Sequence, residues 1–178
     1  ALPGMSYDTN RHVITVVATD NGDGTLSIAV QQGSSTNPTF TNTYTPNSVV
    51  NTPLGVTKVL EGRDPGLQAG EFTFEMSVSA QAGSPANGFT LPASTTAANG
   101  ADGSVTFGMI TFTQPGVYDV TVREVIPAEQ APFMEYDNHV FTYTVTVTDN
   151  TATGELEAVV SGVEEGEAVF TNTYTPED

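Results

Sequence analysis

Lys58, Glu124 and Asn172 are the residues of this sequence whose types suit a reaction between side chains, and Lys58 is its only lysine. An ammonium group in an apolar interior loses its hydration, so its pKa falls and the neutral, nucleophilic amine becomes populated. A buried glutamic acid that stays protonated can polarise an amide carbonyl and relay a proton to a leaving group. These residue types predict attack of the Lys58 amine on the Asn172 side chain. Glu124 would stabilise the oxyanion, and ammonia would leave.

Alternation of apolar and polar residues places all three on apolar faces of β-strands. Lys58 lies in a strand predicted over residues 54–60, Glu124 in one over 116–126, and Asn172 in the last strand of the chain. Charged groups on a buried face are costly unless they are paired or neutralised, so their joint occurrence is informative. Further strands are predicted over 71–80, 104–113, 139–148 and 155–160. In the 104–113 strand the alternation of apolar and polar residues is interrupted near Gly108, as at a β-bulge.

Each of the three residues also has an ordinary structural interpretation. Lys58 can extend its amine to water from an edge strand, as lone lysines in strands commonly do. Glu124 can end its strand in solvent beside Arg123, and Asn172 can be a hydrogen-bonded strand residue. Spacing and alternation alone leave these alternatives open.

Composition narrows the class of protein. Many β-branched residues, 17 glycines and 11 prolines, without helical periodicity, predict an all-β fold. A net charge of -17 argues against binding to nucleic acid or to an anionic membrane surface. Cysteine is absent and there are two histidines, so we expect no disulfide, metal site or cofactor. No apolar run approaches the roughly 20 residues of a membrane span, and no signal peptide opens the chain. We therefore expect a mature soluble protein or a piece of a longer one.

The sequence contains a repeat. Residues 7–46 and 136–176 both begin with Tyr-Asp and both end with Phe-Thr-Asn-Thr-Tyr-Thr-Pro. The spacing predicts a tandem unit of about 130 residues, which is a normal size for a β-sandwich. Residues 54–178 would be one complete domain, 47–53 a linker, and 1–46 the C-terminal third of a preceding copy. That third is explained by a fragment cut from a tandem array, or by pairing with a complementary half-domain from another chain.

Several motifs, taken in order, resemble the streptococcal-type pilin isopeptide-linkage domain. They are Val56-Thr-Lys-Val-Leu-Glu-Gly62, Gly70-Glu-Phe-Thr-Phe-Glu75, Asp102-Gly-Ser-Val-Thr-Phe107, Pro115-Gly-Val-Tyr118, Val122-Arg-Glu-Val125, Tyr136-Asp137 and Phe170-Thr-Asn-Thr-Tyr174. The resemblance implies an Ig-like, CnaB-like β-sandwich on a Gram-positive cell surface or pilus. It also implies an isopeptide bond between Lys58 and Asn172, with Glu124 as the proton relay. Asn42 occupies the asparagine position of the partial copy, whose lysine and glutamate are missing, so it should be unreacted or reactive only toward a complementary half.

The expected function is therefore that of a structural stalk or shaft domain in an adhesin or pilus protein, with neighbouring tandem domains as its partners. The self-reaction consumes its own residues, so we expect no turnover enzyme. The alternative is an adhesin module that binds a host ligand through its loops, for which residues 80–103 are the best candidate. Residues 20–24 resemble part of a calcium loop, but they lack its distal glutamate and are better interpreted as a hairpin turn.

Overall fold

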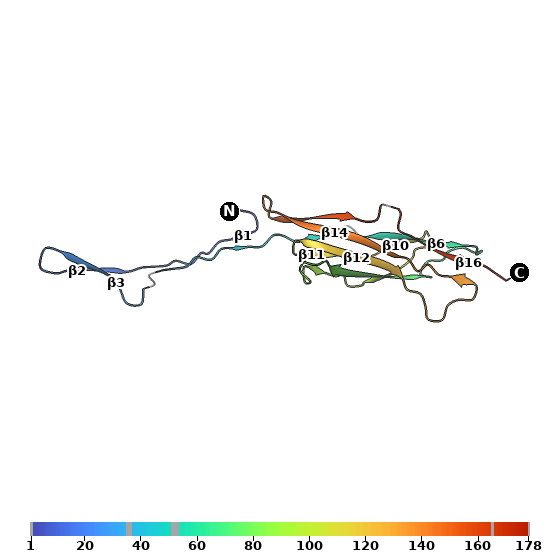
Figure 1. Cartoon of the computed structure of the whole chain (residues 1–178), viewed down its shortest axis with the longest axis horizontal. Coiled ribbons are helices and arrows are strands. Elements are labelled where there is room, and N and C mark those ends of the chain that lie inside the picture. The colour runs from blue at the N-terminus through green and yellow to red at the C-terminus, as the bar shows by residue number, and fades with distance from the viewer. Residues whose placement is uncertain (1, 35–36, 51–53, 165, 178) are drawn as a thin grey trace.

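The structure is a computed structural model that describes residues 2–34, 37–50, 54–164 and 166–177. The described residues form β-strands, turns and loops, with no helix among them (Figure 1). The strands are β1 (Met5–Ser6), β2 (Val16–Asp20), β3 (Leu26–Val30), β4 (Thr43–Tyr44), β5 (Val49–Val50), β6 (Gly55–Glu61), β7 (Thr73–Ala80), β8 (Phe89–Thr90), β9 (Thr96–Ala98), β10 (Ser104–Thr106), β11 (Thr111–Phe112), β12 (Gly116–Glu124), β13 (Met134–Glu135), β14 (Val140–Asn150), β15 (Glu155–Ser161) and β16 (Val169–Tyr174). Nothing in this part of the chain is a helix long and apolar enough to cross a bilayer.

Two sheets pack face to face as an Ig-like β-sandwich. One sheet has the strand order β10-β6-β16-β13, and the other has the order β15-β14-β12-β7-β9. A small third sheet, β5-β11-β8, lies beside them. The first and last long strands of the sandwich, β6 and β16, are parallel neighbours, whereas the other strand pairs are antiparallel.

The core lies between the two sheets and follows the predicted alternation. Inward residues of β12 and β14 are buried, while the threonines of β14 alternate with them. Phe170 on β16 packs against Phe74 at 5.2 Å and Phe141 at 4.9 Å between ring centroids, and so ties the two sheets together. Such aromatic pairs stabilise a core beyond their buried area. The buried apolar residues are Leu54, Val56, Phe72, Phe74, Met76, Val105, Phe107, Ile110, Phe112, Tyr118, Val120, Val122, Tyr143, Val145, Val147, Leu156, Ala168 and Phe170.

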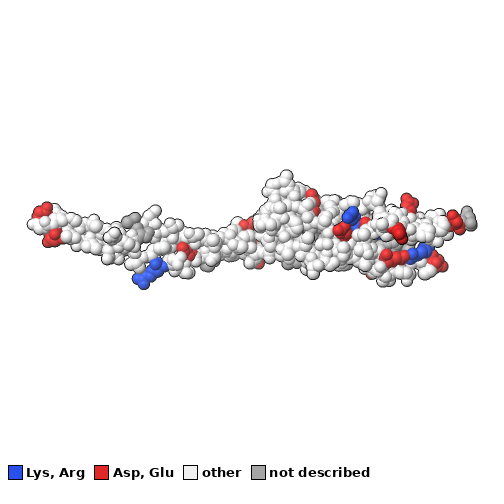
Figure 2. All heavy atoms as spheres, turned by 90° about the horizontal axis from the view of Figure 1, so that it is seen from below, with Lys and Arg blue, Asp and Glu red and all other residues white. Residues whose placement is uncertain are grey.

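Residues 2–34 and 37–46 form an extended ribbon that projects from the sandwich and ends in the β2–β3 hairpin (Figure 1). Residues 20–24 make the predicted hairpin turn, in which Asp23 Oδ1 accepts a hydrogen bond from the Thr25 amide at 2.9 Å. Tyr44 joins the ribbon to the sandwich, because its hydroxyl donates to Asp149 at 2.8 Å. Acidic side chains lie at the hairpin tip and around the sandwich, with few basic ones among them (Figure 2).

Three segments differ from their sequence-based description. The predicted strand over 104–113 is wrong as a single strand, because β10 and β11 belong to different sheets and the chain crosses between them. A Cβ at Gly108, in this crossing, would press against Pro92. Within the segment expected to be a linker, β5 pairs with β11, whereas residues 51–53 lie outside the described part. The candidate loop 80–103 includes two short strands, β8 and β9.

Candidate functional site

The candidate site lies between the two sheets and is built from both of them. Lys58 comes from β6 and Asn172 from the adjacent parallel strand β16, where the Cα of Asn172 lies opposite that of Leu60. The Cα of Lys58 lies opposite that of Phe170, so the lysine and the asparagine share the inward face, two positions apart. Glu124 is the last residue of β12 and reaches them from the facing sheet.

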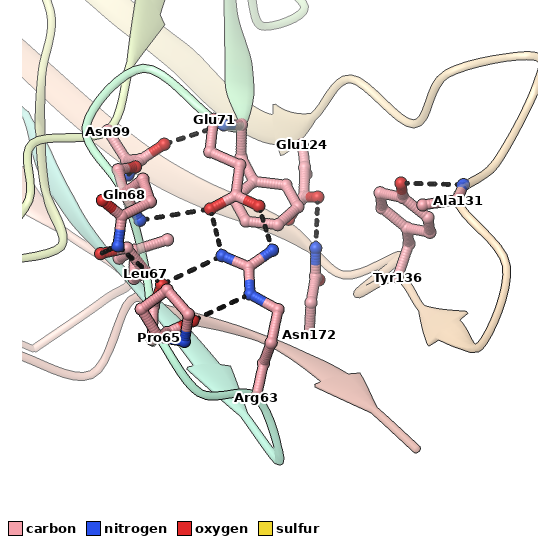
Figure 3. A network of polar contacts seen from close by, with 12 residues as sticks. Arg63, Pro65, Leu67, Gln68, Glu71, Asn99, Glu124, Ala131, Tyr136 and Asn172 are labelled. Atoms are coloured by element: carbon pink, nitrogen blue, oxygen red, sulfur yellow. Dashed lines mark hydrogen bonds and ion pairs between the residues drawn. The ribbon is translucent and has the colours of Figure 1, made fainter. Parts of the chain in front are cut away.

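The structure brings Lys58, Glu124 and Asn172 together, and all three are buried. Lys58 Nζ donates to Glu124 Oε2 at 2.8 Å, and Asn172 Nδ2 donates to Glu124 Oε1 at 2.7 Å. The ordinary interpretations of Lys58 and Glu124 as solvent-facing do not apply, because their side chains have no exposed surface. Figure 3 shows the side chain of Asn172 directed at Glu124.

The surroundings of Lys58 are apolar. Its Nζ lies 4.6 Å from the centroid of the Phe72 ring, and Phe170 is fully buried on the neighbouring strand. Burial lowers the pKa of Lys58 from its ordinary value, and the hydrogen bond and the charge of Glu124 offset this only in part. The site therefore favours the neutral amine more than water does. A neutral amine beside an amide has the chemistry of a nucleophile facing an acyl group.

The carboxyl group of Glu124 links the two nitrogen atoms. One oxygen faces the amine of Lys58 and the other faces the amide nitrogen of Asn172. A group in this position can take a proton from one nitrogen and give a proton to the other, which is general acid–base catalysis. The contact differs from the expected one, in which Glu124 donates to the amide oxygen of Asn172. That part of the expectation is wrong, because Glu124 meets the nitrogen side of the amide.

The oxygen of the Asn172 amide has a different partner. Asn172 Oδ1 accepts a hydrogen bond from the backbone N–H of Asp137 at 2.7 Å. The carboxylate of Asp137 in turn accepts the N–H of Thr171 at 2.7 Å and that of His139 at 2.9 Å. Sequence reasoning assigned no role to Asp137. The signal available was the recurrence of Tyr-Asp at the start of both repeats, at nearly the same distance from the asparagine.

Asn42, the fourth residue singled out from the sequence, lies far from the buried site on the exposed ribbon. Its Oδ1 accepts the N–H of Asp8 at 3.0 Å. The structure thus brings Lys58, Glu124 and Asn172 together and leaves Asn42 apart from them.

A comparison with models of protein families matches the chain over residues 1–45 and 54–175, to the FctA family, described as the Spy0128-like isopeptide containing domain. The match covers most of the 178 residues. The chain belongs to the Spy0128-like isopeptide containing domain family.

A comparison with the curated proteins finds none that matches this chain. Among solved structures, it is similar to the major pilin protein (T-13) from Streptococcus pyogenes, with 19% sequence identity and a TM-score of 0.41. The similarity covers 73% of this chain and 54% of the pilin, so the chain spans about half the length of that protein.

Proposed function

We propose that this member of the Spy0128-like family is a structural domain of a pilus shaft or surface stalk, and that an amide bond between Lys58 and Asn172 holds it closed. The observation that supports the proposal is the buried arrangement in which Glu124 contacts both reacting nitrogens at 2.7–2.8 Å. The family match and the apolar surroundings of Lys58 support it as well.

The reaction needs only groups of this chain. Glu124 Oε2 takes a proton from Lys58 Nζ, and the neutral amine attacks Cγ of Asn172. The C=O electron pair moves onto Oδ1, Glu124 gives its proton to Nδ2, and Glu124 then takes the second proton from the Lys58 nitrogen. When the electron pair returns from Oδ1, the Cγ–Nδ2 bond breaks and ammonia leaves, so the new amide keeps one N–H hydrogen and Glu124 ends protonated. The fold supplies a high effective concentration of the two groups, and exclusion of water protects the amide from hydrolysis. The reaction occurs once, since it consumes both side chains.

A bond at this position suits a structure that is pulled from its ends. β6 and β16 are neighbours in one sheet, so the bond would join the first long strand of the sandwich to its last. Tension that enters at one end would pass through the amide to the other end without separating the strands between them. Because the chain has no cysteine, a disulfide cannot serve this purpose, and reducing conditions leave an amide intact.

A Gram-positive cell surface is the setting that we propose, with neighbouring tandem domains of the same protein as partners. The basis is the repeat within the chain, together with the description of the solved structure it resembles as a major pilin protein from Streptococcus pyogenes.

For residues 1–46 we propose pairing with a complementary half-domain. In the β2–β3 hairpin, Val16 pairs with Val30 as Val145 pairs with Val160 in the complete domain. The exposed fraction is 54% for Val16 and 0% for Val145. Apolar strand residues of this kind are stabilised when a second sheet covers them. Asn42 would stay unreacted until such a half brings a lysine and a glutamate.

Intact mass tests the proposed bond. The wild-type chain should be lighter than its sequence mass by one ammonia, and peptide mapping should recover residues 58 and 172 in one cross-linked peptide. Lys58→Ala and Glu124→Gln should both have the full sequence mass, while Asn42→Ala should still lose one ammonia. A wild-type chain at its full mass would overturn the proposal.

A further inference from the structure

Two turns, one in each repeat, hold an asparagine side chain in the same way. In the complete domain, the backbone N–H of Asp137 donates to Asn172 Oδ1 at 2.7 Å. The carboxylate of Asp137 accepts the N–H of Thr171, the residue before the asparagine, at 2.7 Å. It also accepts the N–H of His139, two residues further along, at 2.9 Å. We call this set of three hydrogen bonds the amide clamp.

The partial copy repeats the amide clamp bond for bond. The N–H of Asp8 donates to Asn42 Oδ1 at 3.0 Å. The Asp8 carboxylate accepts the N–H of Thr41 at 3.0 Å and that of Asn10 at 2.8 Å. The aspartate and the asparagine are 34 residues apart here and 35 apart in the complete domain.

The two copies of the clamp have opposite surroundings. Asn172 is fully buried beside Lys58 and Glu124, whereas Asn42 is exposed, and the lysine and glutamate of its own repeat are missing. The same geometry in both places means that packing around the reactive site does not create the clamp. It is a local property of the Tyr-Asp turn and of the segment that carries the asparagine.

We propose that the amide clamp is the oxyanion-binding element of the cross-linking reaction, with the Asp137 N–H as donor and the Asp137 carboxylate as the group that positions it. This inference rests on the proposed function. When Lys58 Nζ attacks Cγ of Asn172, the C=O electron pair moves onto Oδ1, where the Asp137 N–H already points. A fixed donor aimed at developing negative charge stabilises the transition state, and it does so strongly where water is excluded.

The clamp also sets the direction of the reaction. Because the N–H of Asp137 engages the oxygen of the amide, the nitrogen of Asn172 must face Glu124. The leaving group therefore lies next to the acid that protonates it. A reversed amide would place its oxygen against Glu124 and its nitrogen against an N–H donor, where it has no hydrogen-bond acceptor.

The carboxylate of Asp137 is suited to a positioning role. Burial acts to raise its pKa, but the N–H groups of His139 and Thr171 and the side chain of His139 outweigh burial, so the pKa lies below its ordinary value. The group is then ionised at neutral pH and accepts hydrogen bonds from Thr171 in β16 and from His139 in the loop that precedes β14. Hydrogen bonds to an ionised acceptor are stronger than those between neutral groups.

The rate of cross-linking tests the clamp. Full-length chains are made by cell-free translation, sampled over time, and their intact mass is followed until one ammonia is lost. We expect Asp137→Ala to slow the loss by about tenfold or more, given that removal of one oxyanion donor costs about a hundredfold or more and that here the donor is misplaced and not removed. Asp137→Asn, which keeps an acceptor oxygen but loses the charge, should react at an intermediate rate and carries the test if Asp137→Ala does not fold.

Asn99→Ala is the matched control for a purely structural effect. Asn99 is buried, and its side chain bonds Phe72 N, Gln68 O and Gly100 O, none of which belongs to the clamp. We expect this variant to lose stability but to react within about twofold of the wild-type rate. Aspartate variants that react as fast as the wild type, or no slower than Asn99→Ala, would overturn the clamp and leave the proposed bond intact. A wild-type chain that never loses ammonia would overturn both.

Discussion

Lys58 and Asn172 project from adjacent parallel strands on the same face of one sheet, and the carboxyl group of Glu124 lies between their nitrogen atoms. The two residues are 114 positions apart in the sequence but only two apart in strand register. A bond between them would close nearly the whole domain into one covalent loop.

The first prediction concerns thermal stability. Glu124→Gln keeps the shape of the side chain but removes the group that carries the proton, so Lys58 and Asn172 should stay unlinked. The simple loop-closure model gives a cross-link of this length roughly 4–5 kcal/mol of stabilisation. The melting temperature should therefore fall by on the order of 10–20 °C, as measured by calorimetry. Asn42→Ala should melt as the wild type does, and a Glu124→Gln protein within a few degrees of wild type would contradict the role of the bond.

The second prediction concerns pH. In Asn172→Ala the amine of Lys58 cannot react and remains titratable. Its folded-state pKa is depressed by burial, so between that pKa and about 10.4 the unfolded chain binds more protons than the folded one. The free energy of unfolding contributed by this group should therefore rise with pH across the window.

The measurement for the pH prediction is denaturant unfolding of Asn172→Ala at several pH values. The double variant Lys58→Met/Asn172→Ala is the control, because it lacks the amine but retains the other titrating groups. The difference between the two variants should narrow as pH rises. A constant difference would mean that burial does not depress the pKa of the amine.

The third prediction concerns Gly103, which adjoins the backbone of Lys58. The N–H of Lys58 donates to the Gly103 carbonyl at 2.7 Å, and a Cβ on Gly103 would overlap the carbonyl oxygen of Lys58. Gly103 also has a φ of 84°, which side-chain-bearing residues adopt at a cost. Gly103→Ala should displace β6, lower the melting temperature and reduce the fraction of cross-linked chains.

Gly70→Ala separates the two causes of the destabilisation expected for Gly103→Ala, which are the positive φ and the overlap with the carbonyl oxygen of Lys58. Gly70 has a φ of 76°, but a Cβ there meets nothing within 4 Å. This variant should lose only about 1–2 kcal/mol from the backbone conformation and should cross-link fully. Equal losses in the two variants would show that the overlap with Lys58 does not matter.

The fourth prediction concerns the division of the chain. The ribbon formed by residues 2–34 and 37–46 is largely exposed, whereas residues 54–178 contain the buried core. Limited proteolysis followed by mass spectrometry should therefore cut between residues 9 and 40 first and leave a product that contains 54–178. Early cuts inside the sandwich, at a rate similar to those in the ribbon, would contradict the proposed boundary.

Much of the sandwich could be predicted because alternation is a local property. The inward faces of β7, β12, β14 and β16 follow directly from which residues alternate, and that pattern also placed Lys58, Glu124 and Asn172 on buried faces. The family model then confirms the resemblance that their order indicated.

Other features depend on long-range geometry that alternation does not contain. The switch from β10 to β11 requires knowledge of which sheet each half joins, and a slip near Gly108 in the pattern is equally consistent with a bulge. The orientation of the Asn172 amide depends on a backbone N–H that comes from a turn 35 residues away. A backbone donor is not specified by residue type, so the signal in the sequence for Asp137 was only the recurrence of Tyr-Asp in both repeats.

The parallel pairing of β6 and β16 has a consequence for assembly. Both strands run in the same direction, so the chain enters the sandwich at the end where β6 begins and leaves it at the opposite end, where β16 finishes. Copies joined end to end would therefore lengthen the row with little change in its width. Each copy would add about the length of one strand. If each copy carried the proposed bond between its β6 and β16, such a row would be a series of covalently closed domains.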